Sequence, residues 1–313
     1  MTVTLTTPRP VPYRIAGWLC QPRHQTTTVQ VLVSGLTYTH RYWTGPGPNN
    51  NQVAAALAAG DAVYLFDRLG TGDSDRPPAA QVTTTSEAAA THQILHALRN
   101  GTLGHYPRVI GVGHSFGTVI WMAEAATYRD VDALVLTGLL HDINLDAMTR
   151  FTTDLYPAGQ DPQFAASAPP DGYLTTRPGS RADYFLNPDT SPDVAAWDES
   201  TKTTATTGEL TFTPEDELRY SRAIQIPVLL VLGATDALFC GAAQPCATPA
   251  DICQRERPAF PHSADLTAAI LPATGHSINL HPTAPLAFAL MNRWLADLDN
   301  GPDHRPQFAD CRR

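Results

Sequence analysis

The sequence predicts an α/β fold in which helices cover both faces of a mainly parallel sheet, with a lid inserted between two parts of the core. Short runs rich in β-branched residues alternate with Ala- and Leu-rich stretches of helical length. This alternation is typical of parallel strands joined by helical crossovers. The alternation of strand-like and helix-like runs stops between Thr137 and Ile226, a stretch too long to be a single loop in a compact domain.

The composition indicates a folded protein and argues against several classes of partner. Of the 313 residues, 43% are hydrophobic, which is enough apolar material for a large core. The 30 acidic and 21 basic side chains give a net charge of −9, which would repel a nucleic acid. No apolar run approaches the roughly 20 residues needed to cross a bilayer, and the first ten residues lack the apolar stretch of a signal peptide. We therefore expect a soluble cytoplasmic protein without nucleic-acid or membrane partners.

Six runs are expected to form the strands of the sheet, because each is short, apolar and bounded by turn residues. They are Gln30–Val33, Ala62–Phe66, Val109–Val112, Val131–Leu136, Val228–Leu232 and Thr267–Leu271.

Two helices can be placed by the residues at their ends. Ser86 is predicted to be the N-cap of a helix that continues to Arg99. Pro285 is predicted to lie in the first turn of a final helix. The apolar face of that final helix is predicted from a four-residue repeat: Leu286, Leu290 and Trp294.

This interruption of the strand–helix alternation divides the chain into three parts. They are a first part of the core (1–137), a lid (138–226) and a second part of the core (227–313). We expect the lid to be helical around Asp142–Tyr156 and Pro214–Ile224, and we expect the Thr-rich stretch Thr201–Thr207 to be an exposed loop.

One motif indicates a catalytic nucleophile. Gly113-His-Ser-Phe-Gly117 has the pattern G-x-S-x-G, with a predicted strand before it and a helical run after it. A nucleophile elbow requires this strand–turn–helix setting, because glycines let strand and helix approach closely while the serine protrudes on a strained backbone. Ser115 is therefore the predicted nucleophile, and its neighbour His114 is expected to point back into the sheet.

A serine hydroxyl needs a base within reach and a carboxylate to orient that base. His276 comes directly after the last predicted strand, and Asp236 follows the strand Val228–Leu232, so both are expected on loops at the carboxyl edge of the sheet. Asp251 is the alternative acid. The order along the chain is nucleophile, acid, histidine (Ser115, Asp236, His276), which is the order expected of the α/β-hydrolase fold.

The chain resembles a serine α/β-hydrolase over essentially its whole length, with the lid as its variable part. The resemblance rests on the elbow, on the acid and histidine loops, and on Phe66–Pro77, which is similar to the family's loop after the fourth strand. It implies an acyl-enzyme mechanism without metal or organic cofactor. It also implies an oxyanion hole formed by the backbone N–H groups of Leu36 and Phe116, although Ser34-Gly35 replaces the usual His-Gly of the family.

Aromatic residues suggest where a substrate pocket lies. Tyr38 and Trp43 lie further along the loop that carries Leu36, and Tyr184 and Phe185 belong to the lid. They either line the pocket or pack the loop and the lid against the core. The run Tyr38-x-His40-x-Tyr42-Trp43 and the Cys-containing loop after Asp236 also resemble hydrolases of bacterial secondary metabolism.

Five cysteines are present, and three of them lie between Cys240 and Cys253. Their spacing is not typical of a zinc site. A disulfide from Cys240 to Cys246 or to Cys253 is a hypothesis that would restrain the loop carrying Asp236. The tail Asp310–Arg313 is expected to be solvated.

The expected function is hydrolysis of a carboxylic ester, lactone or thioester of a mostly apolar small molecule. The alternative is a lyase, cyclase or acyltransferase of natural-product biosynthesis that uses the same three residues, since one fold supports several reactions. A ligand-binding protein on a retained hydrolase scaffold is the third hypothesis.

Overall fold

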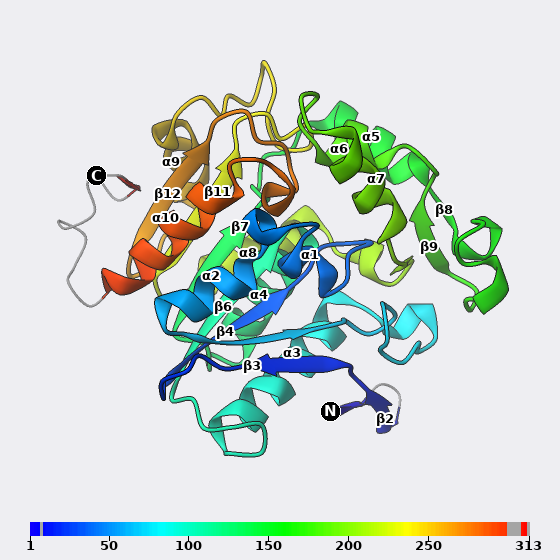
Figure 1. The fold of residues 1–313 in the computed structure, drawn as a ribbon, viewed down its shortest axis with the longest axis horizontal. Helices are drawn as coiled ribbons and strands as arrows, with labels where there is room; N and C mark the ends of the chain where they lie inside the picture. The colour runs from blue at the N-terminus through cyan, green and yellow to red at the C-terminus, as the bar shows by residue number, and fades with distance from the viewer. Residues whose placement is uncertain (7–8, 299–307, 312–313) are drawn as a thin grey trace.

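The computed structural model describes residues 1–6, 9–298 and 308–311. An eight-stranded sheet runs through its centre in the order β13-β12-β11-β7-β6-β4-β5-β3 (Figure 1). The six inner strands are parallel to one another, and the edge strands β3 and β13 are antiparallel to their neighbours. The predicted α/β fold with a mainly parallel sheet is confirmed.

All six predicted strands are present, and their residues are buried almost without interruption, as expected for parallel strands covered on both faces. The strands of the main sheet are β3 (Gly17–Cys20), β4 (Thr28–Val33), β5 (Ala62–Phe66), β6 (Arg108–His114), β7 (Ala133–Thr137), β11 (Val228–Gly233), β12 (Leu266–Leu271) and β13 (Ala309–Asp310). A hairpin of β1 (Thr2–Leu5) and β2 (Val11–Arg14) stands apart from it.

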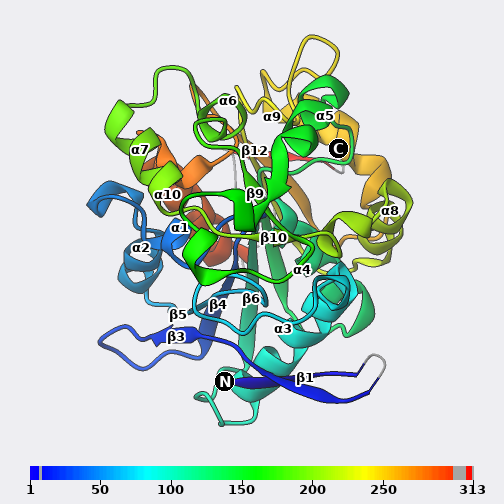
Figure 2. The ribbon, with the colours of Figure 1, turned by 90° about the vertical axis from the view of Figure 1, so that its right-hand side faces the viewer.

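Helices cover both faces of the sheet, with α2 and α10 on one side and α3, α4 and α8 on the other (Figure 2). The helices are α1 (Arg41–Thr44), α2 (Gln52–Ala59), α3 (Thr84–Arg99), α4 (Phe116–Thr127), α5 (Leu145–Asp154), α6 (Arg181–Phe185), α7 (Pro192–Ser200), α8 (Pro214–Ala223), α9 (Pro249–Glu256) and α10 (Ala284–Ala296). No helix among the described residues combines the length and the apolar character that spanning a membrane requires.

The predicted N-cap of α3 was wrong by three residues. Thr83 is the N-cap, and its hydroxyl accepts a hydrogen bond from the amide of Ser86 at 3.2 Å. The Ser86 hydroxyl in turn accepts from the amide of Thr83 at 2.8 Å. Ser86 therefore completes a capping box from inside the helix, and either hydroxyl could have been chosen from the sequence alone.

The final helix begins as predicted, with Pro285 in its first turn, but its predicted apolar face was wrong in part. Leu286 is 47% exposed. A strict repeat of four residues drifts around a helix that has 3.6 residues per turn. The buried face instead follows steps of three and four: Ala284, Ala287, Phe288, Met291, Trp294 and Leu295.

Between β7 and β11 the chain leaves the main sheet, and we call residues 138–227 the β7–β11 segment. It contains the predicted helices α5 and α8 and a small antiparallel sheet of β8 (Leu155–Pro157), β9 (Tyr173–Thr176) and β10 (Ala205–Thr206). Helix α8 packs against α4, whereas β8, β9 and α5–α7 form the part that projects beside the main sheet (Figure 1). That this segment acts as a lid remains a prediction.

The prediction of an exposed loop at Thr201–Thr207 was wrong. Thr204 and Thr206 are each 1% exposed, and their hydroxyls donate to the carbonyl oxygens of Gly70 and Val82 at 2.5 and 3.2 Å. Polar side chains can be buried when every hydroxyl has a partner. The Thr-rich stretch thus binds the β7–β11 segment to the loops that follow β5.

Helix α4 lies at the centre of the core and buries an acidic side chain. Glu124 is fully buried in the last turns of this helix. Burial first, and then the charge of Asp130, raises the pKa of the Glu124 carboxyl to about 10. The carboxyl is therefore protonated in the folded protein at neutral pH.

This raised pKa predicts a pH-dependent loss of stability. Between an unfolded pKa of about 4.3 and the folded pKa, only the folded state holds the Glu124 proton, so stability is present at low pH and lost as the pH rises. We expect Glu124→Gln, which cannot ionise, to lose about 1 kcal/mol less per pH unit than the wild type across this window. Urea unfolding at a series of pH values measures this difference.

The exposed Glu215→Gln serves as the matched control and should keep the wild-type pH dependence. Parallel stability profiles for Glu124→Gln and the wild type would contradict the assignment.

Candidate active site

Ser115 occupies the sharp turn between β6 and α4. Strand β6 ends at His114 and helix α4 begins at Phe116, which leaves Ser115 at φ 54° and ψ −123°. A positive φ is strained for a residue with a side chain, and such strain is maintained only where the surroundings enforce it. The structure therefore confirms the predicted strand–turn–helix with Ser115 at its tip.

Close packing explains the glycines on either side of Ser115. A Cβ atom on Gly117 would lie 2.0 Å from the Val33 carbonyl oxygen, and one on Gly113 would lie 2.8 Å from the Cα of Thr118. The amide of Ser115 donates to the carbonyl of Thr137 at 2.8 Å, which fastens the turn to β7. Only glycine lets α4 approach β4 and β6 this closely.

The loops after β11 and β12 bring Asp236 and His276 together. Nδ1 of His276 lies 2.9 Å from Oδ2 of Asp236, and both side chains are buried. The second carboxylate oxygen of Asp236 accepts from the amide of Leu238 at 3.0 Å. Asp251, the alternative acid, instead caps α9 by accepting from the amide of Thr248 at 2.7 Å. The histidine is thus oriented by Asp236.

The other ring nitrogen of His276 is left without a partner. Nε2 is buried and makes no hydrogen bond to any described residue, Ser115 included. The His276 loop nevertheless meets the elbow, because Nε2 of His114 contacts the His276 carbonyl at 3.3 Å. A Cβ on Gly138, just after β7, would lie 3.0 Å from that same carbonyl. Hydrogen bonds between a nucleophile and its base are often long in free enzymes and shorten in the substrate complex.

His114 does not point back into the sheet as predicted but packs among the loops of the site. Its ring centroid lies 4.2 Å from that of Tyr42, 4.9 Å from that of His276 and 5.5 Å from that of Tyr38. Burial first, and then the charges of His276 and Arg181, hold the pKa of His114 well below its usual value. A neutral His114 places no positive charge beside His276.

The loop after β4 lies against the elbow, and we call its residues 35–38 the oxyanion loop because they include Leu36, a predicted oxyanion donor. A Cβ on Gly35 would come 2.8 Å from the Cβ of Ser115, so loop and elbow are in direct contact. Thr37 has a φ of 61°, and the amide of Tyr38 donates to the Gly35 carbonyl at 3.3 Å, which closes a turn around Leu36. The amide of Phe116, at the first position of α4, has no partner within the helix.

The four predicted pocket residues fall into two groups. Phe185 stacks on His276 with 5.5 Å between ring centroids, and the Tyr38 hydroxyl lies 2.7 Å from the hydroxyl of Ser277, next to that histidine. Tyr184 donates to Asp154 at 2.6 Å, and Trp43 is completely buried with its ring 4.9 Å from that of Tyr42. The structure brings only Phe185 and Tyr38 to the histidine loop.

One aromatic residue of the site was missed in the sequence. Phe239 stacks on His276 with a centroid distance of 5.8 Å. Its position three residues after Asp236, on a loop already expected at the site, was the available signal. Together with Phe185 it surrounds the imidazole with apolar surface.

A family model described as the alpha/beta hydrolase family matches residues 30–289. The chain belongs to this family. No curated protein sequence matches it significantly.

Solved structures agree with this alpha/beta hydrolase assignment. A protein described as a non-heme bromoperoxidase, BpoC from Mycobacterium tuberculosis H37Rv, is 21% identical, with a TM-score of 0.63 over 90% of this chain and 96% of its own. The enol-lactonase from Burkholderia xenovorans LB400 is 16% identical, with a TM-score of 0.60 over 92% and 97%. Esterase RhEst1 from Rhodococcus sp. ECU1013 is 19% identical, with a TM-score of 0.59 over 95% and 98%. At these identities the likeness shows the fold.

Two disulfides lie in the part of this alpha/beta hydrolase that follows Asp236 in the chain. Cys240 is bonded to Cys246, one of the two pairings considered from the sequence, and closes the loop that follows Asp236. Cys253 on α9 is bonded to Cys311, which is completely buried, so the expectation of a solvated tail is wrong for this residue. Arg312 and Arg313 of that tail lie outside the described residues.

The side chains that could hold a metal lie elsewhere. Among the residues described, His92, Glu124 and Asp130 have potential ligand atoms within 4.8 Å of one another. Glu124 lies near the end of α4 opposite to Ser115, so this group takes no part in the site around His276.

The disulfide pattern makes a direct prediction about thiols. Because Cys20 is the one free cysteine, titration of the unreduced, denatured protein should detect one thiol per chain, and all five after reduction. Cys240→Ser should expose Cys246 and raise the unreduced count to two, whereas Cys20→Ser should lower it to zero. Five thiols in the unreduced wild type would contradict both bonds.

Proposed function

We propose that this alpha/beta hydrolase is a serine hydrolase that cleaves a carboxylic ester, lactone or thioester of a mostly apolar small molecule through an acyl-enzyme on Ser115. The observation that carries the proposal is the buried His276, oriented by Asp236 at 2.9 Å and left with an unpartnered Nε2 beside the nucleophile elbow. A base held in this way is what a serine needs to become a nucleophile.

The three residues divide the work as follows. Asp236 accepts the Nδ1 proton of His276, which fixes the tautomer that keeps the lone pair on Nε2. As the Ser115 oxygen attacks the substrate carbonyl, Nε2 takes the hydroxyl proton and then donates it to the departing alcohol or thiol. Water repeats the attack on the acyl-enzyme and releases the acid and Ser115.

The developing oxyanion needs hydrogen-bond donors beside Ser115. We assign this role to the N–H groups of Phe116, at the start of α4, and Leu36, in the oxyanion loop. The contact between Gly35 and Ser115 supports the assignment, because it keeps this loop against the elbow. Backbone donors suit the task because they are fixed before the reaction begins.

The surroundings of His276 favour an apolar substrate. Phe185 and Phe239 stack on the imidazole, and the Tyr38 hydroxyl is hydrogen-bonded to the hydroxyl of Ser277. An enol-lactonase and an esterase are among the solved structures with this fold, which supports ester or lactone bonds as the target.

The disulfides indicate the redox conditions of the compartment in which the protein acts. Disulfide bonds persist in oxidising compartments and are rare in a reducing cytosol. The bonds Cys240–Cys246 and Cys253–Cys311 therefore favour an oxidising environment over the cytoplasmic location expected from the sequence.

Substitution of Ser115 or His276 tests the proposed reaction. Because each acts in the bond-making step, Ser115→Ala and His276→Ala should each lower kcat by about four to six orders of magnitude. The measurement is turnover of a panel of p-nitrophenyl esters, lactones and acyl thioesters, with fluorophosphonate labelling of the wild type to count active sites. Ser167→Ala, an exposed serine of the β7–β11 segment, is the matched control.

A loss of less than about tenfold in either variant would contradict the assignment. Labelling of Ser115 without turnover of any ester, lactone or thioester would instead favour the lyase, cyclase or acyltransferase alternative.

A further inference from the structure

Two buried arginines contact the oxyanion loop. Nη2 of Arg68 donates to the carbonyl of Gly35 at 3.1 Å, and Nη1 of Arg181 donates to the hydroxyl of Thr37 at 2.7 Å. Each guanidinium is 1% exposed. These bonds reach the residues on either side of Leu36, whose N–H is the proposed oxyanion donor.

The Arg181 guanidinium is itself rigidly held by the β7–β11 segment. Its Nε and Nη2 donate to the two carboxylate oxygens of Asp198 at 2.7 and 3.0 Å. A bidentate pair fixes the plane of the guanidinium, so Nη1 is directed at Thr37. The rings of Tyr38 and Phe185 lie 4.5 and 4.9 Å from the guanidinium carbon and add cation–π contacts.

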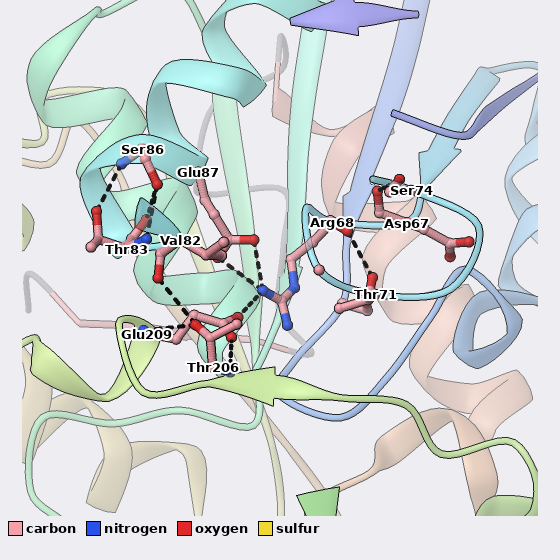
Figure 3. Close-up of polar contacts among 12 residues, drawn as sticks. Asp67, Arg68, Thr71, Ser74, Val82, Thr83, Ser86, Glu87, Thr206 and Glu209 are labelled. Atoms are coloured by element: carbon pink, nitrogen blue, oxygen red, sulfur yellow. Dashed lines mark hydrogen bonds and ion pairs between the residues drawn. The ribbon is translucent and has the colours of Figure 1, made fainter. Parts of the chain in front are cut away.

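Arg68 binds the other side of the oxyanion loop, through the carbonyl of Gly35. It also contacts the β7–β11 segment through Glu209 (Figure 3). Its Nη1 donates to Glu87 of α3 at 2.8 Å and to Glu209 of the β7–β11 segment. Glu209 in turn accepts from the amide of Thr206 at 2.6 Å. The guanidinium carbon lies 5.5 Å from the ring centroid of Phe116, which supplies the second proposed oxyanion donor.

Thr37 is the strained point of the loop. Its φ of 61° is disfavoured for a β-branched residue and needs outside support to persist. That support comes from two residues of the β7–β11 segment. Arg181 donates to the Thr37 hydroxyl, and the amide of Thr203 donates to the Thr37 carbonyl at 2.9 Å.

We propose that Arg181 is a positioning residue that sets the oxyanion hole, by holding Thr37 so that the N–H of Leu36 faces Ser115. The inference rests on the proposed serine-hydrolase function. By this proposal the β7–β11 segment contributes to catalysis, because Arg181 belongs to the segment and positions one of the two oxyanion donors. Arg181 acts through Thr37 rather than on the substrate, because its side chain is only 1% exposed and each of its three nitrogens already donates to Asp198 or Thr37.

The effect should appear in the transition state alone. An oxyanion donor acts on charge that develops during the reaction, and removing one costs about 100- to 1,000-fold in kcat. A donor that is displaced but still present should cost less. We therefore expect Arg181→Lys, which cannot pair in bidentate fashion with Asp198 and reach Thr37 at once, to lower kcat by about 10- to 100-fold.

The test compares substrate with a mimic of the tetrahedral intermediate. For Arg181→Lys and for Thr37→Val, KM for a p-nitrophenyl ester should change by less than about threefold. The affinity for a trifluoromethyl ketone, which forms a tetrahedral adduct on the serine, should fall by the same factor as kcat/KM. Thr37→Val removes a single hydroxyl while keeping the shape of the side chain, so it carries the test if the arginine variant fails to fold.

Matched variants separate positioning from general damage. Arg177→Lys changes an exposed arginine of the same segment and should match the wild type. Thr37→Ser keeps the hydroxyl and should retain most of the activity that Thr37→Val loses. The double variant Arg181→Lys/Thr37→Val should be no worse than the more damaged single variant, because both act through one bond.

Wild-type kcat per fluorophosphonate-labelled site, with wild-type ketone affinity, in both Arg181→Lys and Thr37→Val would overturn the positioning role while leaving the hydrolase function intact. An equal loss in the Arg177→Lys control would also overturn it. A wild type without Ser115-dependent turnover would overturn both proposals together.

Discussion

The hydrogen bond between Asp236 and His276 is the interaction on which the site depends. It joins the loops after two neighbouring parallel strands, β11 and β12, and leaves Nε2 of His276 without a partner, on a loop that contacts the elbow at the end of β6. Aromatic rings stack on the imidazole, and the neutral His114 packs behind it. The parallel sheet makes this arrangement possible because the carboxyl ends of all its inner strands meet at one edge.

Buried charges give the β7–β11 segment its fixed place. Arg181 with Asp198, Lys202 with Asp161, and Arg68 with Glu209 are ion pairs in which each side chain is at most 2% exposed. Burying such pairs costs desolvation, and their net contribution to stability is small. Displacing one partner, however, would leave an uncompensated charge. The first two pairs therefore specify the arrangement within the segment, and Arg68 with Glu209 fixes the segment against the core beside the oxyanion loop, where Arg68 also donates to Gly35.

The features that could be read from the sequence are those that local chemistry dictates. Short apolar runs bounded by turn residues, such as Val228–Leu232, are typical of buried strands, and the elbow around Ser115 needs its glycines because strand and helix meet so closely there. The predictions that failed depended on partners far along the chain. Thr204 was predicted in an exposed loop, but its hydroxyl donates to the carbonyl of Gly70. His114 was predicted to point into the sheet, but its ring packs against residues that follow β4 and β12.

By itself the sequence determined the order of the strands along the chain, the strained turn at Ser115 and the loops that carry Asp236 and His276, because each follows from periodicity and from residues only a few positions apart. The tertiary structure alone decided which acid faces the histidine, which cysteines are bonded and how Arg181 reaches Thr37 across 144 positions. A carboxylate, a thiol or a guanidinium can form the same bonds at any position in a sequence. Which partner it binds therefore depends on which side chains the packing of the whole chain brings next to it.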